Sequence, residues 1–363
     1  MKPRIIALYL PQYHPTPEND EWWGKGFTEW VNVAKARPLF RGHKEPHIPA
    51  DLGFYDLRLP EIREQQAALA KEAGVEAFCY YHYWFGNGKQ ILERPFNEVL
   101  ASGKPDFPFC LCWANHSWYK KNWDPNAKGK NVLLAEQTYP GEQDHIEHFM
   151  SLLPAFKDER YVRVNGKLFF SIYDAVTFPH INDFVTLWRR LAKENGLNDF
   201  FFITEDADSR NKELHFKNGI DAVYNVDMFN IHHHLSKISK IFHLYERKWL
   251  KRPTVFSYKD AMKYMVIDDC ASRNVIPTII PNWDHSPRSG HNAIILKNST
   301  PQLFQQLAER AIDIVSNKSE EEQLIMLKSW NEWGEGNYMK PDLEFGHGYI
   351  DALRTAIENK RVK

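Results

Sequence analysis

Short apolar runs, rich in β-branched and aromatic residues, recur through the chain and alternate with stretches of helical periodicity. Eight of these runs predict buried β-strands, and they cover residues 5–10, 75–84, 107–115, 167–174, 200–206, 221–226, 275–284 and 324–333. Strands that alternate with helices are parallel and are joined by crossover helices. Because eight continuous apolar strands favour a closed barrel over an open sheet, we predict an α/β fold, a single (β/α)8 TIM-type barrel domain over residues 1–363.

Helix signals lie between several of these strands. The predicted helices cover residues 59–74, 181–196, 260–274 and 300–315. Gly74 and Gly196 mark two C-terminal ends, and Thr300 is the expected N-cap of the last helix. Residues 11–58 and 227–258 do not fit the alternation. We interpret them as long insertions after the first and sixth strands, of the kind that cover or line a binding site.

Composition narrows the classes of function. The formal net charge is -1 and the pI is about 7.0, so nothing calls for a nucleic-acid partner. No GxGxxG motif follows the first strand, which counts against a dinucleotide-binding fold. The four cysteines lack zinc-ligand spacing, and the adjacent histidines in residues 231–236 cannot all face one ion. We therefore predict neither a metal nor another cofactor.

Cysteine usage and hydropathy bear on the compartment. The cysteines resemble core thiols, which fits a reducing environment. The first apolar run is too short for a secretory signal, and no segment approaches 18 uninterrupted apolar residues. We therefore expect a cytoplasmic protein, although a leader trimmed from this sequence would leave no trace in it.

Aromatic and polar side chains gather where the predicted strands end. In a (β/α)8 barrel these ends share one face, and the chemistry sits there. Aromatic rings can bury the C–H face of a sugar, while amides, imidazoles and carboxylates bind its hydroxyls. The predicted substrate-binding residues are Tyr9, Glu29, Trp30, Tyr81, His82, Trp84, Trp113, Asn115, His116, Tyr173, Asp174, Glu205, Trp283, Asp284, Asn331 and Trp333.

The stretch SWNEWGEGNY, residues 329–338, places Glu332 and Glu335 three positions apart where the last predicted strand ends. In a continuing strand these positions face opposite sides. Gly334 and Gly336 permit a turn, after which the two side chains share a side with Cβ atoms roughly 5–6 Å apart. Two carboxylates this close do not both ionise easily, so one pKa should rise and leave a neutral acid beside an anion. We predict that both glutamates are catalytic.

Several motifs carry a family resemblance. The stretches IIALYLPQYHP, WWGKGFTEW, YYHYWF, WANHSW and WNEWGEG resemble WbsX-type proteins of bacterial surface-polysaccharide clusters over essentially the whole chain. Those proteins resemble, more distantly, glycoside hydrolase family 99, the endo-acting α-mannosidases and α-mannanases built on a (β/α)8 barrel. That second resemblance rests mainly on the two-glutamate motif and the barrel layout.

The resemblance implies a retaining mechanism with distinct roles for the two glutamates. Glu332 would act as base on the sugar's 2-hydroxyl, which attacks the anomeric carbon to give a 1,2-anhydro intermediate. Glu335 would be the general acid on the leaving oxygen and then the base for the acceptor. Internal attack requires the 2-hydroxyl to lie anti to the leaving group, which α-manno- and α-rhamno-configured sugars satisfy.

The leading hypothesis is therefore an endo-acting glycoside hydrolase or transglycosylase that acts on α-manno- or α-rhamno-linkages of a bacterial surface polysaccharide. The substrate would be an oligo- or polysaccharide, either free or lipid-linked. One alternative is a glycosyltransferase of lipopolysaccharide or O-antigen biosynthesis, for which the Asp-Ala-Asp triplet at 206–208 is weak evidence. Another is a carbohydrate-binding barrel without activity, which would not need both glutamates close together.

Residues 237–252 are basic, aromatic and amphipathic. Such a segment can lie on an anionic membrane surface, or its apolar positions can pack within the protein. We favour the second interpretation at this stage, because buried apolar helix faces are the commoner case. Nothing in the sequence predicts the oligomeric state.

Overall fold

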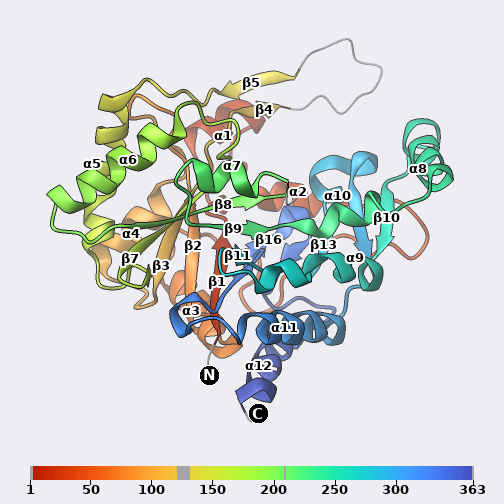
Figure 1. Cartoon of the computed structure of the whole chain (residues 1–363). Coiled ribbons are helices and arrows are strands. Elements are labelled where there is room, and N and C mark those ends of the chain that lie inside the picture. Colours follow the sequence, from red (N-terminus) through yellow and green to blue (C-terminus); the bar gives the residue numbers. More distant parts are fainter. Residues whose placement is uncertain (1–2, 121–130, 208–209, 362–363) are drawn as a thin grey trace.

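The computed structural model describes residues 3–120, 131–207 and 210–361, and it shows a barrel of parallel strands with helices around it (Figure 1). The strands follow the order β11-β9-β8-β7-β3-β2-β1-β15-β12, and every neighbouring pair in this order is parallel. In that order they cover Val275–Ile276, Ala222–Asn225, Phe200–Asp206, Lys167–Ile172, Phe109–Trp113, Ala77–His82, Arg4–Tyr9, Leu324–Leu327 and Thr278–Ile279. The predicted TIM-type barrel is confirmed.

The barrel closes through one interrupted strand. β11 and β12 flank Pro277; β11 pairs with β9, and β12 pairs with β15. Proline has no N–H to donate to a ladder, but its carbonyl oxygen accepts from the Met326 N–H at 3.0 Å. Counted as one strand, β11 and β12 complete the eight predicted strands. The predicted run 275–284 is too long, because β13 (Trp283–Asp284) leaves the barrel and pairs antiparallel with β14 (Ile294–Lys297).

Helices follow most barrel strands, as the alternation predicts. They are α3 (Pro60–Ala73), α4 (Arg94–Ser102), α5 (Glu142–Lys157), α6 (Ile181–Glu194), α7 (Lys212–Lys217), α11 (Pro301–Val315) and α12 (Gly348–Arg361). The expected N-cap forms, since Thr300 Oγ1 accepts the Leu303 N–H at 3.3 Å. The helix predicted over 260–274 is shorter, because α9 (Tyr258–Met265) ends before a one-turn 3-10 segment at Asp268–Ala271.

Both predicted insertions are present. After β1 come α1 (Pro17–Trp23) and α2 (Glu29–Lys35). After β9 come a 3-10 segment (Asp227–His232), α8 (Lys237–Trp249), β10 (Thr254–Ser257) and α9. The sequence did not predict the antiparallel pair β4 (Trp118–Lys120) and β5 (Val132–Ala135) after β3. The insertions lie at the barrel's carboxyl end, where they can shape a site.

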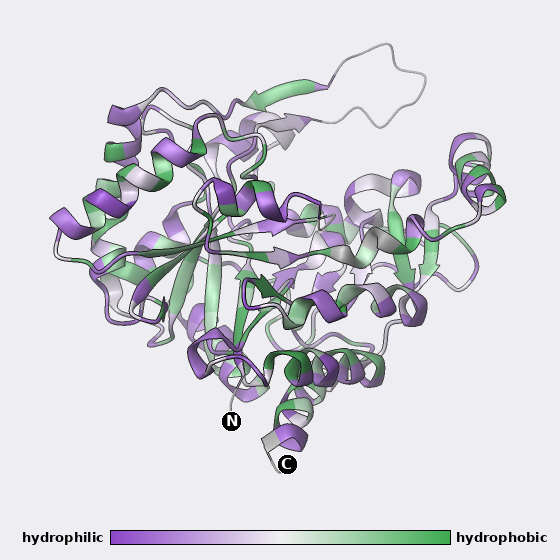
Figure 2. Cartoon of the chain, in the orientation of Figure 1, coloured by the Kyte–Doolittle hydropathy of each residue, from purple (hydrophilic) through white to green (hydrophobic). Residues whose placement is uncertain are grey.

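A cluster of aromatic rings joins α5 and α6 to the strands β7 and β8. The central barrel strands are mostly hydrophobic, whereas the helices alternate in colour (Figure 2). Trp188 of α6 is fully buried, and its ring lies 4.6 Å from Phe184 and 4.9 Å from Phe170 between centroids. Further ring partners of Trp188 are Phe149, Phe156, Phe200 and Phe202. This packing fixes α6 on the barrel.

We predict that Trp188→Ala lowers the free energy of unfolding by about 3–5 kcal/mol, because it removes a fully buried ring and leaves a cavity. Chemical denaturation measures this loss. Trp249→Ala is the matched control: that side chain is 71% exposed, so its removal should change stability by no more than about 0.5 kcal/mol. Equal losses in the two variants would contradict the packing described above.

Candidate active site

The two predicted catalytic glutamates lie on a tight hairpin after the last barrel strand. β16 (Asn331–Glu332) pairs antiparallel with β17 (Asn337–Tyr338), and a 3-10 turn at Trp333–Glu335 joins them. The turn brings both side chains to one guanidinium nitrogen. Arg288 Nη1 pairs with Glu335 Oε1 and lies 3.6 Å from Glu332 Oε2. The carboxyl groups therefore converge on one point.

Two glycines make this turn possible. Gly336 has φ +52°, and a Cβ there would lie 2.7 Å from the Cβ of Asp284. Gly334 lies under a neighbouring carboxylate, since a Cβ on it would lie 1.7 Å from Glu29 Oε1. Side chains at these positions would push the turn away from its partners.

Asn331 ties the hairpin to the first barrel strand's end. Its Oδ1 accepts the Leu10 N–H at 2.7 Å, and its Nδ2 donates to the Leu10 carbonyl oxygen at 2.9 Å. The Tyr13 hydroxyl donates to the Asn331 carbonyl oxygen and accepts the Trp333 N–H at 3.1 Å. Asn331 is fully buried, so it positions the hairpin and does not face the cavity.

Arg288, on the short helix α10 (Ser286–Ser289), is the positive centre of the site. Its Nε donates to Glu29 Oε1 at 2.8 Å, in addition to the contacts with Glu332 and Glu335. Burial alone would lower the pKa of Arg288, but these carboxylates outweigh it and hold the pKa well above its ordinary value. The guanidinium therefore stays charged among three carboxyl groups.

The environments of Glu332 and Glu335 push their proton affinities apart. Burial, and then the charge of Glu335, raise the pKa of Glu332 well above its ordinary value. Burial acts in the same direction on Glu335, but Arg288 and then His285 outweigh it and hold the pKa of Glu335 well below its ordinary value. His285 Nε2 lies 3.6 Å from Glu335 Oε1. One proton therefore resides on Glu332 beside an anionic Glu335.

A second buried ion pair completes the charge pattern. Lys328, which follows β15, lies 2.9 Å from Glu205 of β8 between Nζ and Oε2. Its Nζ also lies 5.8 Å from the centre of the Tyr173 ring. Burial lowers the pKa of Lys328, but Glu205 outweighs this and keeps it above the ordinary value. The cavity wall therefore carries two fixed cations.

The carboxyl pair opens into a cavity of about 560 Å³ at the barrel's carboxyl end. Its wall combines aromatic rings with amide, hydroxyl and charged groups, as a sugar site requires. The lining residues are Leu10, Gln12, Trp23, Phe27, Glu29, Asn32, Tyr81, Tyr83, Ala114, His116, Ser117, Trp118, Tyr119, Leu134, Tyr173, His285, Arg288, Lys328, Glu332 and Glu335. Six predicted site residues are among them: Glu29, Tyr81, His116, Tyr173, Glu332 and Glu335.

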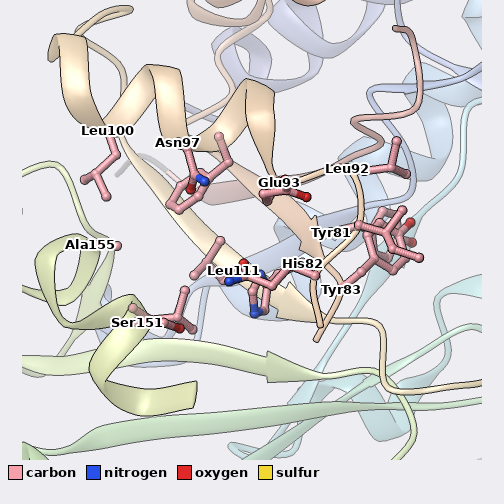
Figure 3. A pocket seen from close by; sticks show the side chains of 14 residues that line it. Tyr81, His82, Tyr83, Leu92, Glu93, Asn97, Leu100, Leu111, Ser151 and Ala155 are labelled. Atoms are coloured by element: carbon pink, nitrogen blue, oxygen red, sulfur yellow. The ribbon is translucent and has the colours of Figure 1, made fainter. Parts of the chain in front are cut away.

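Strand alternation places several of the other predicted sugar contacts outside this cavity. Tyr81 and Tyr83 turn to one side of the chain and His82 to the other (Figure 3). His82 lies in a small cavity of about 90 Å³ between β2, α4 and α5, and its Nε2 lies 2.8 Å from Nε2 of His148. Burial lowers the pKa of His82 to about 3, so it stays neutral. Trp84 also faces α5, where its ring stacks on His148 at 4.7 Å.

Tyr9 and Trp113 face outward for the same reason. The Tyr9 ring packs 4.7 Å from Tyr80 between centroids, and the Trp113 ring packs 4.7 Å from His148. In a strand, successive side chains point to opposite faces, so only alternate residues at a strand end can reach the mouth. The structure does not place Tyr9, His82, Trp84 or Trp113 in the cavity.

The remaining predicted contacts support loops instead of lining the cavity. Asn115 Oδ1 accepts the Asp174 N–H at 2.8 Å, and the Asp174 carboxylate accepts backbone N–H groups of the turn that follows. Trp30 of α2 and Trp333 of the 3-10 turn pack together at 5.6 Å between ring centroids. Glu205 is linked to the cavity by its ion pair with Lys328, which lines the cavity wall. Trp283 and Asp284 lie on β13, outside the barrel.

Arg288, Lys328, His285 and Tyr83 are the cavity residues with clear chemistry that the sequence did not assign. Lys328 interrupts the apolar run 324–333, which is a signal for a buried, paired charge. Arg288 had no comparable signal, because it lies on α10, whose position depends on β13 leaving the barrel.

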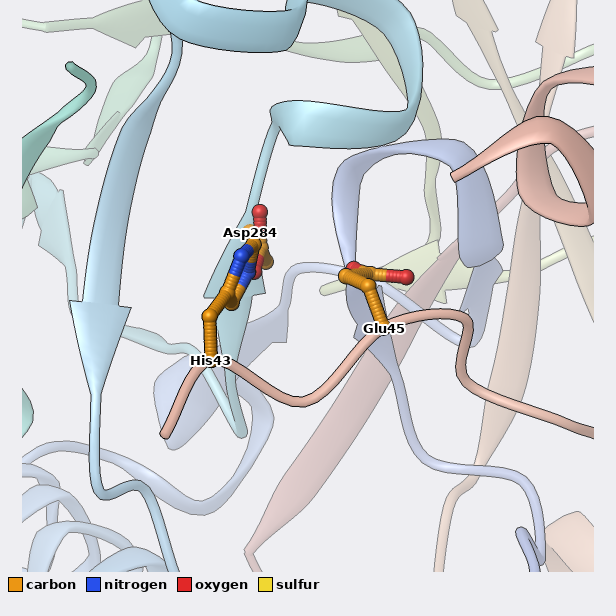
Figure 4. Close-up of side chains that lie close together, drawn as sticks. All are labelled: His43, Glu45 and Asp284. Carbon is orange, nitrogen blue, oxygen red and sulfur yellow. The ribbon is translucent and has the colours of Figure 1, made fainter. Parts of the chain in front are cut away.

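Within the described residues, one group offers ligand atoms for a metal: His43, Glu45 and Asp284 (Figure 4). The imidazole is already engaged, however. The Leu39 N–H donates to His43 Nδ1 at 3.0 Å, so Nε2 carries the proton that it donates to Asp284 Oδ2 at 2.6 Å. A metal at Nε2 would displace that proton and leave the ring with none. We infer that these three side chains hold the insertion after β1 against β13.

The chain is thus an eight-stranded TIM barrel whose aromatic-lined cavity holds two convergent glutamates. The family model described as glycosyltransferase WbsX matches residues 5–353, and the chain belongs to this family. The family predicted from the motifs is thus confirmed.

The chain is also similar in sequence to a curated protein and shares its fold with solved structures. The "Uncharacterized protein WxcX" of Xanthomonas campestris pv. campestris strain B100 is 32% identical over 97% of this chain. The alignment covers 49% of that protein, so the chain spans about half its length. The endo-α-mannosidase of glycoside hydrolase family 99 from Bacteroides thetaiotaomicron shares the fold, with a TM-score of 0.57, 13% identity and coverage of 99% and 98% of the two chains. A structure titled "Glycoside hydrolase-like protein" gives 0.58 at 14% identity, with coverage of 98% and 94%.

In the described part of the chain, no helix combines the length and hydrophobicity needed to cross a bilayer.

Glu45 gives a pH-dependent prediction. Burial, and then the charge of Asp284, raise the pKa of Glu45 from 4.5 to about 9. A carboxyl whose pKa is raised on folding contributes stability that is present below pH 4.5 and lost as the pH rises toward 9. Glu45→Gln keeps the neutral shape and should raise Tm relative to wild type by at least about 2 °C more at pH 8.5 than at pH 5.

Thermal melts across this range measure the difference. Glu61→Gln, at an exposed glutamate of α3, is the matched control and should leave the pH dependence of Tm unchanged. A constant offset between Glu45→Gln and wild type at all pH values would show that Glu45 ionises normally.

Proposed function

We propose that the chain is a glycan-active enzyme that uses Glu332 and Glu335 in a retaining reaction on α-manno- or α-rhamno-configured linkages. The observation that carries the proposal is the convergence of a neutral and an anionic carboxyl on Arg288, inside a cavity lined by aromatic rings. A retaining reaction needs one carboxyl group as an acid and a second as a base or nucleophile, and the opposite pKa shifts of Glu332 and Glu335 supply one of each.

The position of the proton on the Glu332–Glu335 pair bears on which glutamate acts as the acid and which as the base. A 1,2-anhydro route needs Glu335 protonated toward the leaving oxygen and Glu332 ionised toward the 2-hydroxyl. In the free protein the proton sits on Glu332, because Arg288 pairs with Glu335. Arg288 Nη1 is also 3.6 Å from Glu332, so a bound sugar that displaces it from Glu335 toward Glu332 would reverse the two proton affinities.

If Arg288 stays in place, the roles are exchanged. Glu335 would then be the nucleophile and Glu332 the acid of a double displacement with a covalent glycosyl-enzyme. Both routes retain the anomeric configuration, and the leaving-group test below separates them. The axial 2-hydroxyl of manno- and rhamno-sugars is essential only to the 1,2-anhydro route.

The shape and chemistry of the cavity support a glycan substrate. Tyr81, Tyr83 and Tyr173 supply rings and hydroxyls, while Trp23 and Trp118 supply apolar faces. The fold shared with a family 99 endo-α-mannosidase supports cleavage within a manno-configured chain. We propose a bacterial surface oligo- or polysaccharide as the substrate class.

Transfer to a sugar is the second candidate, because the family itself is described as a glycosyltransferase. A transglycosylase would use the same two glutamates, with a sugar hydroxyl in place of water in the second step. A transferase that uses a nucleotide-sugar needs a separate nucleotide site. Of the Asp-Ala-Asp triplet, Asp206 is buried and Asp208 lies outside the described residues.

We predict that Glu332→Gln and Glu335→Gln each lower turnover of an α-mannan- or α-rhamnan-type oligosaccharide by about 10²–10⁴-fold, because each removes a proton-transfer group. The affinity for the intact oligosaccharide should stay nearly unchanged. Product NMR gives turnover and the anomer first released, and calorimetry gives affinity. Glu21→Gln, at an exposed glutamate of α1 beside the cavity, should keep wild-type turnover.

A glycosyl fluoride of the same oligosaccharide assigns the roles, since fluoride leaves with little need of protonation. The 1,2-anhydro route predicts that Glu335→Gln regains activity on the fluoride and Glu332→Gln does not. The reverse result would assign the acid to Glu332. Full turnover by both variants on every substrate would refute the proposed roles of the two glutamates. Binding of the oligosaccharide by wild type without any turnover would indicate a binding barrel instead.

A further inference from the structure

The helix α8 shows its apolar face to solvent and its polar face to the protein. The helix projects from the insertion after β9 (Figure 1), and none of its residues, all of which the structure describes, is buried. The half-buried positions include Ser239, Lys240, His243 and Glu246, which are polar. A helix that merely flanks a site should bury its apolar side instead. The interpretation favoured from the sequence, in which the apolar positions pack within the protein, is therefore wrong.

Five exposed apolar residues of α8 form one continuous stripe. They occupy positions i, i+3, i+4, i+7 and i+11, which share one side of a helix. Their exposed fractions are 81% for Ile238, 67% for Ile241, 56% for Phe242, 51% for Tyr245 and 71% for Trp249. The stripe consists of two aliphatic and three aromatic side chains. Apolar side chains exposed singly are normal on a protein surface, but a continuous stripe of five is too large to be an incidental feature.

Positive charge surrounds the stripe. Residues 237–252 hold six Lys and Arg side chains and a single carboxylate, although the whole chain has a net charge of -1. The carboxylate, on Glu246, is turned inward, where its Oε2 lies 3.5 Å from His243 Nδ1. The solvent-facing side of α8 therefore combines apolar rings with the exposed cation Lys248, and Lys251 is exposed just after the helix.

We propose that α8 is a membrane-surface helix that binds anionic lipid. Its apolar stripe would enter the boundary between head groups and acyl chains, while the cations pair with lipid phosphates. Tyr245 and Trp249 are side chains that favour this boundary. A second copy of this chain is a poorer occupant, because two strongly basic helices would face each other. The inference rests on this surface alone and stands whether or not the proposed catalysis is correct.

The test is sedimentation of the full chain with phospholipid vesicles. We expect wild type to bind vesicles of 70% phosphatidylcholine and 30% phosphatidylglycerol at 0.1 M NaCl. Binding to pure phosphatidylcholine, or in 0.5 M NaCl, should be at least about tenfold weaker, because the cations then lack partners or are screened. The triple variant Ile241→Ser/Phe242→Ser/Trp249→Ser and the double variant Lys248→Glu/Lys251→Glu should each lose at least about tenfold in partition coefficient.

A matched control separates this helix from general stickiness. Met150→Ser/Val176→Ser/Leu343→Ser removes three exposed apolar side chains elsewhere and should bind vesicles like wild type. Because all the altered α8 side chains are exposed, the variants should keep the wild-type Tm, which a thermal melt checks. Failure of wild type to bind the anionic vesicles would overturn the proposal, as would equal loss in the control variant. A dimer in analytical ultracentrifugation that the triple variant dissociates, without vesicle binding, would assign the stripe to a second copy instead.

Discussion

The guanidinium of Arg288 meets the carboxyl groups of Glu29, Glu332 and Glu335 in the mouth of the barrel, and the charge state of the site depends on that meeting. Without a cation, burial would raise the pKa of Glu332 and of Glu335 alike. With Arg288 against Glu335, one carboxyl ionises and its neighbour stays neutral. The same contact places α2 and α10 beside the hairpin. The ion pairs of Arg288 therefore set both the positions of these elements and the charges of the carboxyl groups.

Contacts elsewhere in the fold fix the positions of Arg288 and its three carboxyl partners. Asn331 ties the hairpin to the chain after β1, and the split strand around Pro277 closes the barrel under it. Gly334 and Gly336 let Glu29 and β13 approach at distances that a Cβ would prevent. Lys328 and Glu205 form a second buried pair across the mouth. Each of these contacts joins segments far apart in the sequence, which fits a site assembled from many strand ends.

The sequence predicted the barrel because continuous apolar runs identify buried parallel strands, and it predicted the turn at 332–335 because two glycines flank one of its carboxylates. It could not show which residues at a strand end face inward. His82 and Tyr83 are neighbours of similar character, and only the register of β2 sends one to α5 and the other to the cavity. Arg288 was missed because its position depends on β13 leaving the barrel. The direction of α8 was misjudged, because an amphipathic pattern does not say which face meets the protein.

The claim on which this account depends is that Glu332 and Glu335 share one proton, with the anion held on Glu335 by Arg288. The most direct measurement is a pH titration of ¹³C-labelled glutamate carboxyl groups by NMR, with the two signals assigned from Glu332→Gln and Glu335→Gln. We predict a neutral carboxyl for Glu332 and a carboxylate for Glu335 at pH 7. Two carboxylates at pH 7, each titrating at an ordinary glutamate pKa, would contradict the account.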